Sequence, residues 1–136
     1  MRRRPVARNG VAAMTSVQKR LKIISFVLIA MCIVLAAVDS MAFAFANTSM
    51  GLLQAIIIGV AAVLDAALGV FGIGAANRPS RAELLFPLAT IAAVVNIFAA
   101  LVLVMLPGVY VPNVVNCAVV CLHWHFLKLV RAQALA

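Results

Sequence analysis

Charged residues are scarce in this chain. Lys, Arg, Asp and Glu together make up 10% of the 136 residues, and only three of them are acidic. A soluble globular domain carries about 25% charged residues. Because 67% of the residues are hydrophobic, too few polar residues remain to cover a soluble core. These figures exclude a soluble globular protein and indicate that lipid surrounds most of the chain.

The hydrophobic residues fall into four long runs. A hydrocarbon core about 30 Å thick is crossed by about 20 residues of helix, at 1.5 Å per residue. Four segments reach this length, namely 21–46, 50–76, 82–106 and 112–130. None of them alternates apolar and polar residues with a period of two, which excludes a transmembrane β-barrel. The sequence predicts an all-α polytopic integral membrane protein, built as a four-transmembrane-helix bundle.

Polar segments delimit this predicted transmembrane domain, which covers 21–130. A basic tail (1–20) precedes it and a short tail (131–136) follows it. Ser80 and Glu83, three residues apart before the third run, have the spacing of a capping box.

Lysine and arginine are absent from two of the three loops. Positive charges are retained on the cytoplasmic side of a membrane. The eleven lysine and arginine residues lie in the two tails, at the span ends next to those tails, or in the second loop. They are Arg2, Arg3, Arg4, Arg8, Lys19, Arg20, Lys22, Arg78, Arg81, Lys128 and Arg131. This distribution predicts that both termini are cytoplasmic, in a protein of the cell membrane (the plasma or inner membrane).

The basic N-terminal tail and the first apolar run each have an alternative interpretation. An arginine-rich tail can bind nucleic acid, but beside a membrane span it usually sets topology and attracts anionic lipid head groups. We therefore expect the lipid bilayer, and no nucleic acid, as its partner. The first run could also be a cleaved signal peptide, because Ala44, Phe45 and Ala46 fit the small-x-small pattern of a cleavage site. Its length, which exceeds that of a signal-peptide core, favours a retained span.

Small residues recur along one face of the second run. Helices in lipid pack closely where small side chains let their backbones approach. The residues follow one another at steps of three and four: Gly51, Ala55, Gly59, Ala62, Ala66 and Gly69. We expect this small-residue stripe to be a packing surface, either within the chain or against a partner.

A few strongly polar residues lie at membrane depth, where each is costly and therefore a candidate for function. Counted from the ends of the runs, Asp65, Asn96 and His123 fall near the midplane, so we expect an inner polar cluster. Asp39 and Asn116 fall nearer the outer surface and form a candidate outer pair. No lysine or arginine lies at these depths, so each aspartate is expected to be neutral unless a histidine shares its proton. The two groups could form a proton-responsive path or act as interhelical glue.

Evidence for cofactors is missing. Cys117, Cys121 and His125 share one helical face, but a metal site needs three or four converging ligands. The Cys-x-x-Cys pair of thiol oxidoreductases is also absent. We expect no metal, no cofactor and no catalytic residue.

Three classes of function are compatible with these features. Long loops and a convergent catalytic group are missing, which favours a non-enzymatic accessory, sensor or assembly subunit. The alternative is a small oligomeric proton- or ion-coupled transporter or channel that uses Asp65 and Asp39. A membrane enzyme is the third class. The first two require a larger membrane-protein partner or a homo-oligomer.

Overall fold

Four long helices make up almost all of the computed structural model, which describes residues 13–44, 49–106 and 110–135. They are α1 (Ser16–Ala44), α2 (Ser49–Asn77), α3 (Arg81–Met105) and α4 (Val111–Leu135). Each helix is long and apolar enough to cross a membrane. The predicted all-helical class is confirmed, and the four spans indicate a membrane protein.

Two helices extend at least five residues beyond one end of the apolar runs that predicted them. The first helix begins at Ser16, before the expected start at residue 21. The fourth continues to Leu135, through residues expected to form a tail. Lysine, arginine and glutamine are good helix formers, so a helix does not stop where its apolar run stops. Residues 1–12 of the predicted basic tail lie outside the described residues, as do 45 and 46 of the possible cleavage site.

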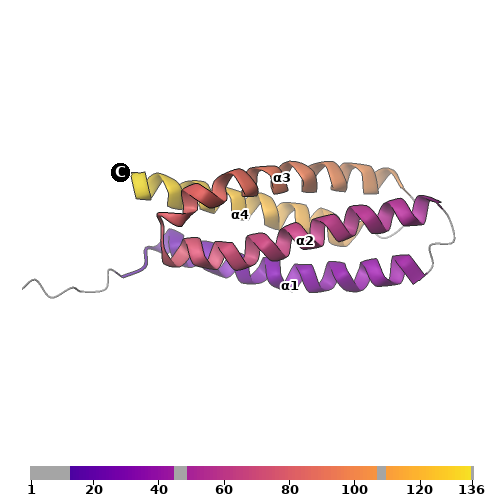
Figure 1. The fold of residues 1–136 in the computed structure, drawn as a ribbon, viewed down its shortest axis with the longest axis horizontal. Coiled ribbons are helices and arrows are strands. Elements are labelled where there is room, and N and C mark those ends of the chain that lie inside the picture. Colours follow the sequence, from indigo (N-terminus) through magenta and orange to yellow (C-terminus); the bar gives the residue numbers. More distant parts are fainter. Residues whose placement is uncertain (1–12, 45–48, 107–109, 136) are drawn as a thin grey trace, which may run out of the picture.

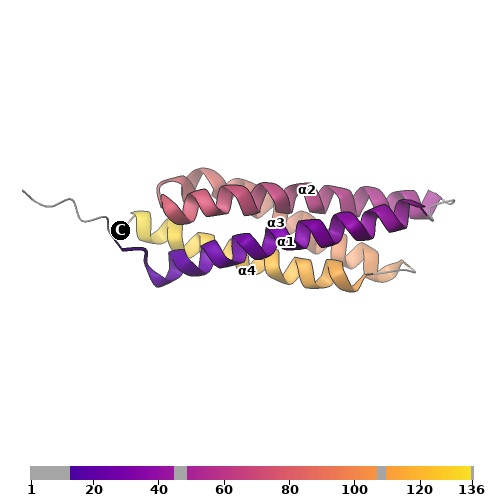
Figure 2. The ribbon, with the colours of Figure 1, turned by 90° about the horizontal axis from the view of Figure 1, so that it is seen from below.

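The helices form an antiparallel bundle (Figures 1 and 2). The most extensive contact is between α1 and α2, followed by that between α3 and α4. The pairs α1–α4 and α2–α3 complete the bundle, and α2 meets α4 across its diagonal. Within the described segments, no Cα atom of α1 lies within 8 Å of a Cα atom of α3. The parallel helices α2 and α4 therefore lie on the short diagonal, at the centre of the molecule.

The positive charges lie at one end of the bundle. At this basic end α1 begins, α2 ends, α3 begins and α4 ends, and every described lysine and arginine lies there. Lys22 bonds to Asn77 Oδ1 across α1 and α2 at 3.2 Å, and Arg131 pairs with Glu83 across α4 and α3 at 3.6 Å. The other end, called the far end here, has α1 joined to α2 and α3 joined to α4.

The four helices do not end level at the far end. In Figures 1 and 2, α1 and α2 extend beyond the first turn of α4. At the basic end, in contrast, α4 reaches past the start of α3 (Figure 1). The fourth helix is therefore displaced towards the basic end. This offset determines which polar side chains come into contact in the interior of the bundle.

The turn before α3 corrects one prediction. Ser80 has helical backbone angles and makes no side-chain cap hydrogen bond, so the expected capping box is not formed. The first backbone N–H groups of α3 instead donate to the carbonyls of 78–79, and Glu83 faces Arg131. Because the tight turn already satisfies those donors, the serine hydroxyl is not needed as a cap.

Candidate functional site

Three polar side chains from three helices meet at the centre of the bundle. Asp65 comes from α2, Asn96 from α3 and Asn116 from α4, and their exposed fractions are 0%, 2% and 0%. We call these three residues the central cluster.

Both carboxylate oxygens of Asp65 are held by amides. Asn116 Nδ2 donates to Oδ2 at 2.6 Å, and Asn96 Nδ2 donates to Oδ1 at 3.5 Å. Asn116 Nδ2 also donates to Asn96 Oδ1 at 2.8 Å, and Asn96 Nδ2 donates to the Ala92 carbonyl at 3.0 Å. All four amide protons of the two asparagines therefore have acceptors. Within the described segments, Asn116 Oδ1 is the only polar side-chain atom of the cluster without a partner.

The central cluster differs from the expected inner cluster in one member. Asp65 and Asn96 lie together as expected, but Asn116 occupies the place expected for His123. The prediction for His123 was wrong because it measured the depth of each residue from the end of its apolar run, as if all four runs ended at the same membrane level. Asp65 lies more than four turns into α2, whereas Asn116 lies in the second turn of the displaced α4. The offset brings these two residues to the same depth.

His123 lies two turns further towards the basic end, against different neighbours. Its side chain is fully buried. A Cβ atom added to Gly72 of α2 would collide with His123 Nε2 and with the Ser25 hydroxyl of α1, so the three residues share one small space. Ser25 donates its hydroxyl to the Leu21 carbonyl at 2.8 Å. Neither ring nitrogen of His123 has a hydrogen-bond partner among the residues that the structure describes.

The central cluster and the His123 site lie at matching positions along α2 and α4. Asn116 and His123 are seven residues apart on α4, and the residues they face, Asp65 and Gly72, are seven apart on α2. A spacing of seven keeps two parallel helices in contact on the same faces. The fully buried side chains of Leu28, Leu68 and Val120 belong to the main apolar core, and their sequence positions place them between the two polar levels. The interior therefore alternates polar and apolar layers.

The expected outer pair is not present as a pair. Asp39 of α1 faces Gly59 of α2, where an added Cβ atom would lie 3.3 Å from Asp39 Oδ2. No hydrogen bond links Asp39 to Asn116 in the part of the chain that the structure describes. Asn113, which the sequence analysis did not single out, is 3% exposed and leaves Nδ2 unpaired. Its position three residues before Asn116, on the same helical face, was the signal that could have identified it.

The small-residue stripe packs partly within the chain. Gly69 approaches α1 closely, because an added Cβ atom would lie 2.9 Å from the Ser25 backbone oxygen and 2.5 Å from Ile29 Cγ1. Gly59 also faces α1, through Asp39. Ala55 and Ala62 are 7% exposed. Much of the stripe is therefore covered by α1 rather than left open for a partner.

Trp124 adds a polar contact between α3 and α4. Its indole Nε1 donates to Thr90 Oγ1 at 3.0 Å, and its ring stacks on Phe86 with 5.9 Å between centroids. Lys128 Nζ lies 5.6 Å from the Trp124 ring centroid. The aromatic ring therefore joins two helices near the basic end.

The cysteines and acidic groups do not form a candidate metal site in the part of the chain that the structure describes. Cys32, Cys117 and Cys121 are free thiols. Among the residues that the structure describes, no group of three or more His, Cys, Asp or Glu side chains is placed to hold a metal ion.

In this arrangement the buried Asp65 side chain links three helices through hydrogen bonds, which stabilise the bundle. The His123 ring lies beside Ser25 without a hydrogen-bond partner among the described residues. This buried imidazole can accept or release a proton. Comparisons with protein-family models, with curated proteins and with solved structures find no match to this chain.

Proposed function

We propose that this protein spans the cell membrane four times with both termini in the cytoplasm, and that it is a non-enzymatic accessory or assembly subunit. The charge distribution supports this orientation. Each described lysine and arginine lies at the basic end, and positive charges remain on the cytoplasmic side.

The observation that carries the subunit proposal is the occupation of both Asp65 oxygens by amide donors. A carboxylate held in this way connects α2 to α3 and α4 instead of presenting a free base to a substrate. In lipid, interhelical hydrogen bonds of this kind contribute about 0.6 kcal/mol on average and up to about 1.7 kcal/mol. A chain with such a fixed interior acts through its outer surface, on a larger membrane protein.

The test is the mass of the native assembly, purified in mild detergent from cells that express the protein at its natural level. The proposal expects a stable complex with a larger chain, identified in the same preparation by mass spectrometry of its peptides. A complex containing only copies of this chain would contradict the accessory role and favour the second candidate below.

A small proton-coupled transporter or channel is the second candidate. The observation that favours it is the set of buried atoms without partners, which includes both His123 nitrogens, Asn113 Nδ2 and Asp39 Oδ1. Buried polar atoms are normally paired with protein or water. Unpaired groups at several levels of the bundle are typical of a path that water or a proton enters.

Flux measurements in liposomes test this candidate. Proton-driven uptake of an ion or small solute should be abolished by Asp65→Asn or His123→Ala and retained in Thr90→Ala, which alters a polar contact outside the central diagonal. If these variants leave the flux unchanged at every pH, the polar residues do not form a transport path.

A further inference from the structure

An apolar groove opens on the outer surface between α2 and α3, close to the basic end. It has a volume of about 720 Å³. Its walls include Phe71 of α2 and Leu84 of α3, which are 59% and 83% exposed, and it extends along α3 as far as Leu88. Gly74 lines it without a side chain. The groove thus runs along the bundle for about two helical turns, from Leu88 to the start of α3.

A positively charged side chain lies at one end of this groove. Arg81, the first residue of α3, is one of the lining residues. Its guanidinium lies against α2, because a Cβ atom added to Gly74 would be 3.8 Å from Arg81 Nη1. The Arg81 side chain makes no hydrogen bond or ion pair within the described segments. The nearby Glu83 is paired with Arg131 instead.

We propose that this groove binds an anionic phospholipid, with one acyl chain between Phe71 and Leu84 and the phosphate on the Arg81 guanidinium. The proposal rests on the proposed membrane insertion. The groove is parallel to the helices, as an acyl chain is in a bilayer, and its charge lies at the level of the head groups. Arginine binds phosphate through several N–H donors in a fixed plane.

Charge argues against a second copy of the chain in the same place. A helix packed over the groove would bury Arg81 and would have to supply an acidic partner. The chain has only three acidic residues. Two of them, Asp39 and Asp65, face α2 or the interior, and Glu83 is already paired. An anionic phospholipid supplies the missing net negative charge, whereas the choline cation of phosphatidylcholine offsets the charge of its phosphate.

Fluorescence quenching by brominated lipids tests the proposal at the groove itself. The reporter is Phe71→Trp in a chain that also carries Trp124→Phe, reconstituted in phosphatidylcholine vesicles. Phosphatidylglycerol or phosphatidylcholine with brominated acyl chains is then added in turn. We expect the anionic lipid to occupy the site about fivefold more strongly than the neutral lipid, as one basic residue near a membrane surface predicts.

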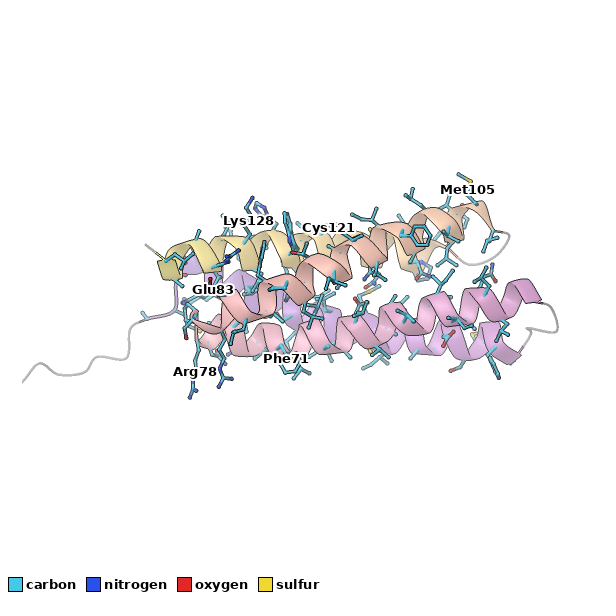
Figure 3. All side chains as sticks on the ribbon, turned by 45° about the horizontal axis from the view of Figure 1, so that its top comes forward. Phe71, Arg78, Glu83, Met105, Cys121 and Lys128 are labelled. Carbon is cyan, nitrogen blue, oxygen red and sulfur yellow. The ribbon has the colours of Figure 1, made fainter. Side chains whose placement is uncertain are left out.

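The matched control is Arg78. It carries the same charge at the same end of the bundle but does not line the groove, and Figure 3 shows it on the same edge of the molecule as Phe71. Arg81→Gln should abolish the preference for phosphatidylglycerol, whereas Arg78→Gln should retain most of it. Equal losses in the two variants, or equal binding of the two lipids by the parent, would overturn the proposal. Absence of quenching by either lipid would contradict membrane insertion as well.

A second variant tests the groove without changing charge. Gly74→Leu places a side chain in the acyl-chain position and should reduce quenching by the anionic lipid severalfold. Ala118→Leu introduces the same side chain at an exposed position on α4 and should have no effect. If Gly74→Leu leaves the quenching by the anionic lipid intact, the acyl chain does not occupy the groove.

Discussion

Asn116 of α4 lies directly opposite Asp65 of α2 and donates its amide to the carboxylate at 2.6 Å. This contact crosses the short diagonal of the bundle, so it holds together two helices that otherwise touch little. Asn96 joins the same carboxylate from α3. The position of α4 along the bundle axis is therefore coupled to one buried hydrogen bond, and the following predictions depend on that register.

Gly69 is expected to tolerate no side chain. Gly69→Ala would place Cβ 2.9 Å from the Ser25 backbone oxygen, and a backbone atom cannot move aside without shifting α1. We expect the free energy of unfolding to fall by about 1–3 kcal/mol, measured by loss of helical circular dichroism during titration with sodium dodecyl sulphate. Gly74→Ala is the control, because its nearest neighbour is the end of a flexible arginine at 3.8 Å. Equal stability of the two variants would show that α1 and α2 are not in close contact at Gly69.

The His123 side chain is expected to lower the free energy of unfolding rather than raise it. Its two ring nitrogens are buried without partners, and such groups carry a desolvation penalty of about 1–3 kcal/mol each in proteins. His123→Leu should therefore leave the free energy of unfolding unchanged or raise it by about 1 kcal/mol in the same titration.

Asn96→Leu provides the matched comparison for that prediction. The change from polar to apolar is similar, but the side chain removed is hydrogen-bonded to Asp65, Asn116 and Ala92. We expect a loss of about 1–2 kcal/mol, from the upper range of interhelical hydrogen bonds in membranes. A loss of the same size in His123→Leu would mean that a water or ligand satisfies the histidine.

The helices and the main buried polar residues were predictable from the sequence, because composition and run length alone distinguish a membrane helix. The contact between Asp65 and Asn96 was also expected from their depth. The roles of Asn116 and His123 were not. Apolar runs mark where a helix meets lipid, but they do not fix how far one helix is displaced along its neighbour. That displacement depends on side-chain packing, such as the approach of Gly72 to His123, and the sequence pattern does not contain it.

The orientation of the bundle predicts a labelling pattern. In a background in which the three cysteines are changed to alanine, single cysteines are introduced as Ser80→Cys at the basic end and Tyr110→Cys at the far end, both exposed positions. A maleimide that cannot cross membranes, added to intact cells, should label only Tyr110→Cys. After permeabilisation both should react. Labelling of Ser80→Cys alone in intact cells would reverse the proposed topology.

The register between α2 and α4 is tested most directly by a double-mutant cycle on Asp65 and Asn116. The stabilities of Asp65→Ala, Asn116→Ala and the double variant should give a coupling energy of about 1 kcal/mol, within the range for interhelical hydrogen bonds in membranes. The control cycle pairs Asn116→Ala with Asp39→Ala. Because no hydrogen bond links those side chains, their effects should add within about 0.5 kcal/mol. Coupling in the first cycle alone is the predicted result; additivity of Asp65 and Asn116, or coupling of Asn116 to Asp39 instead, would contradict it.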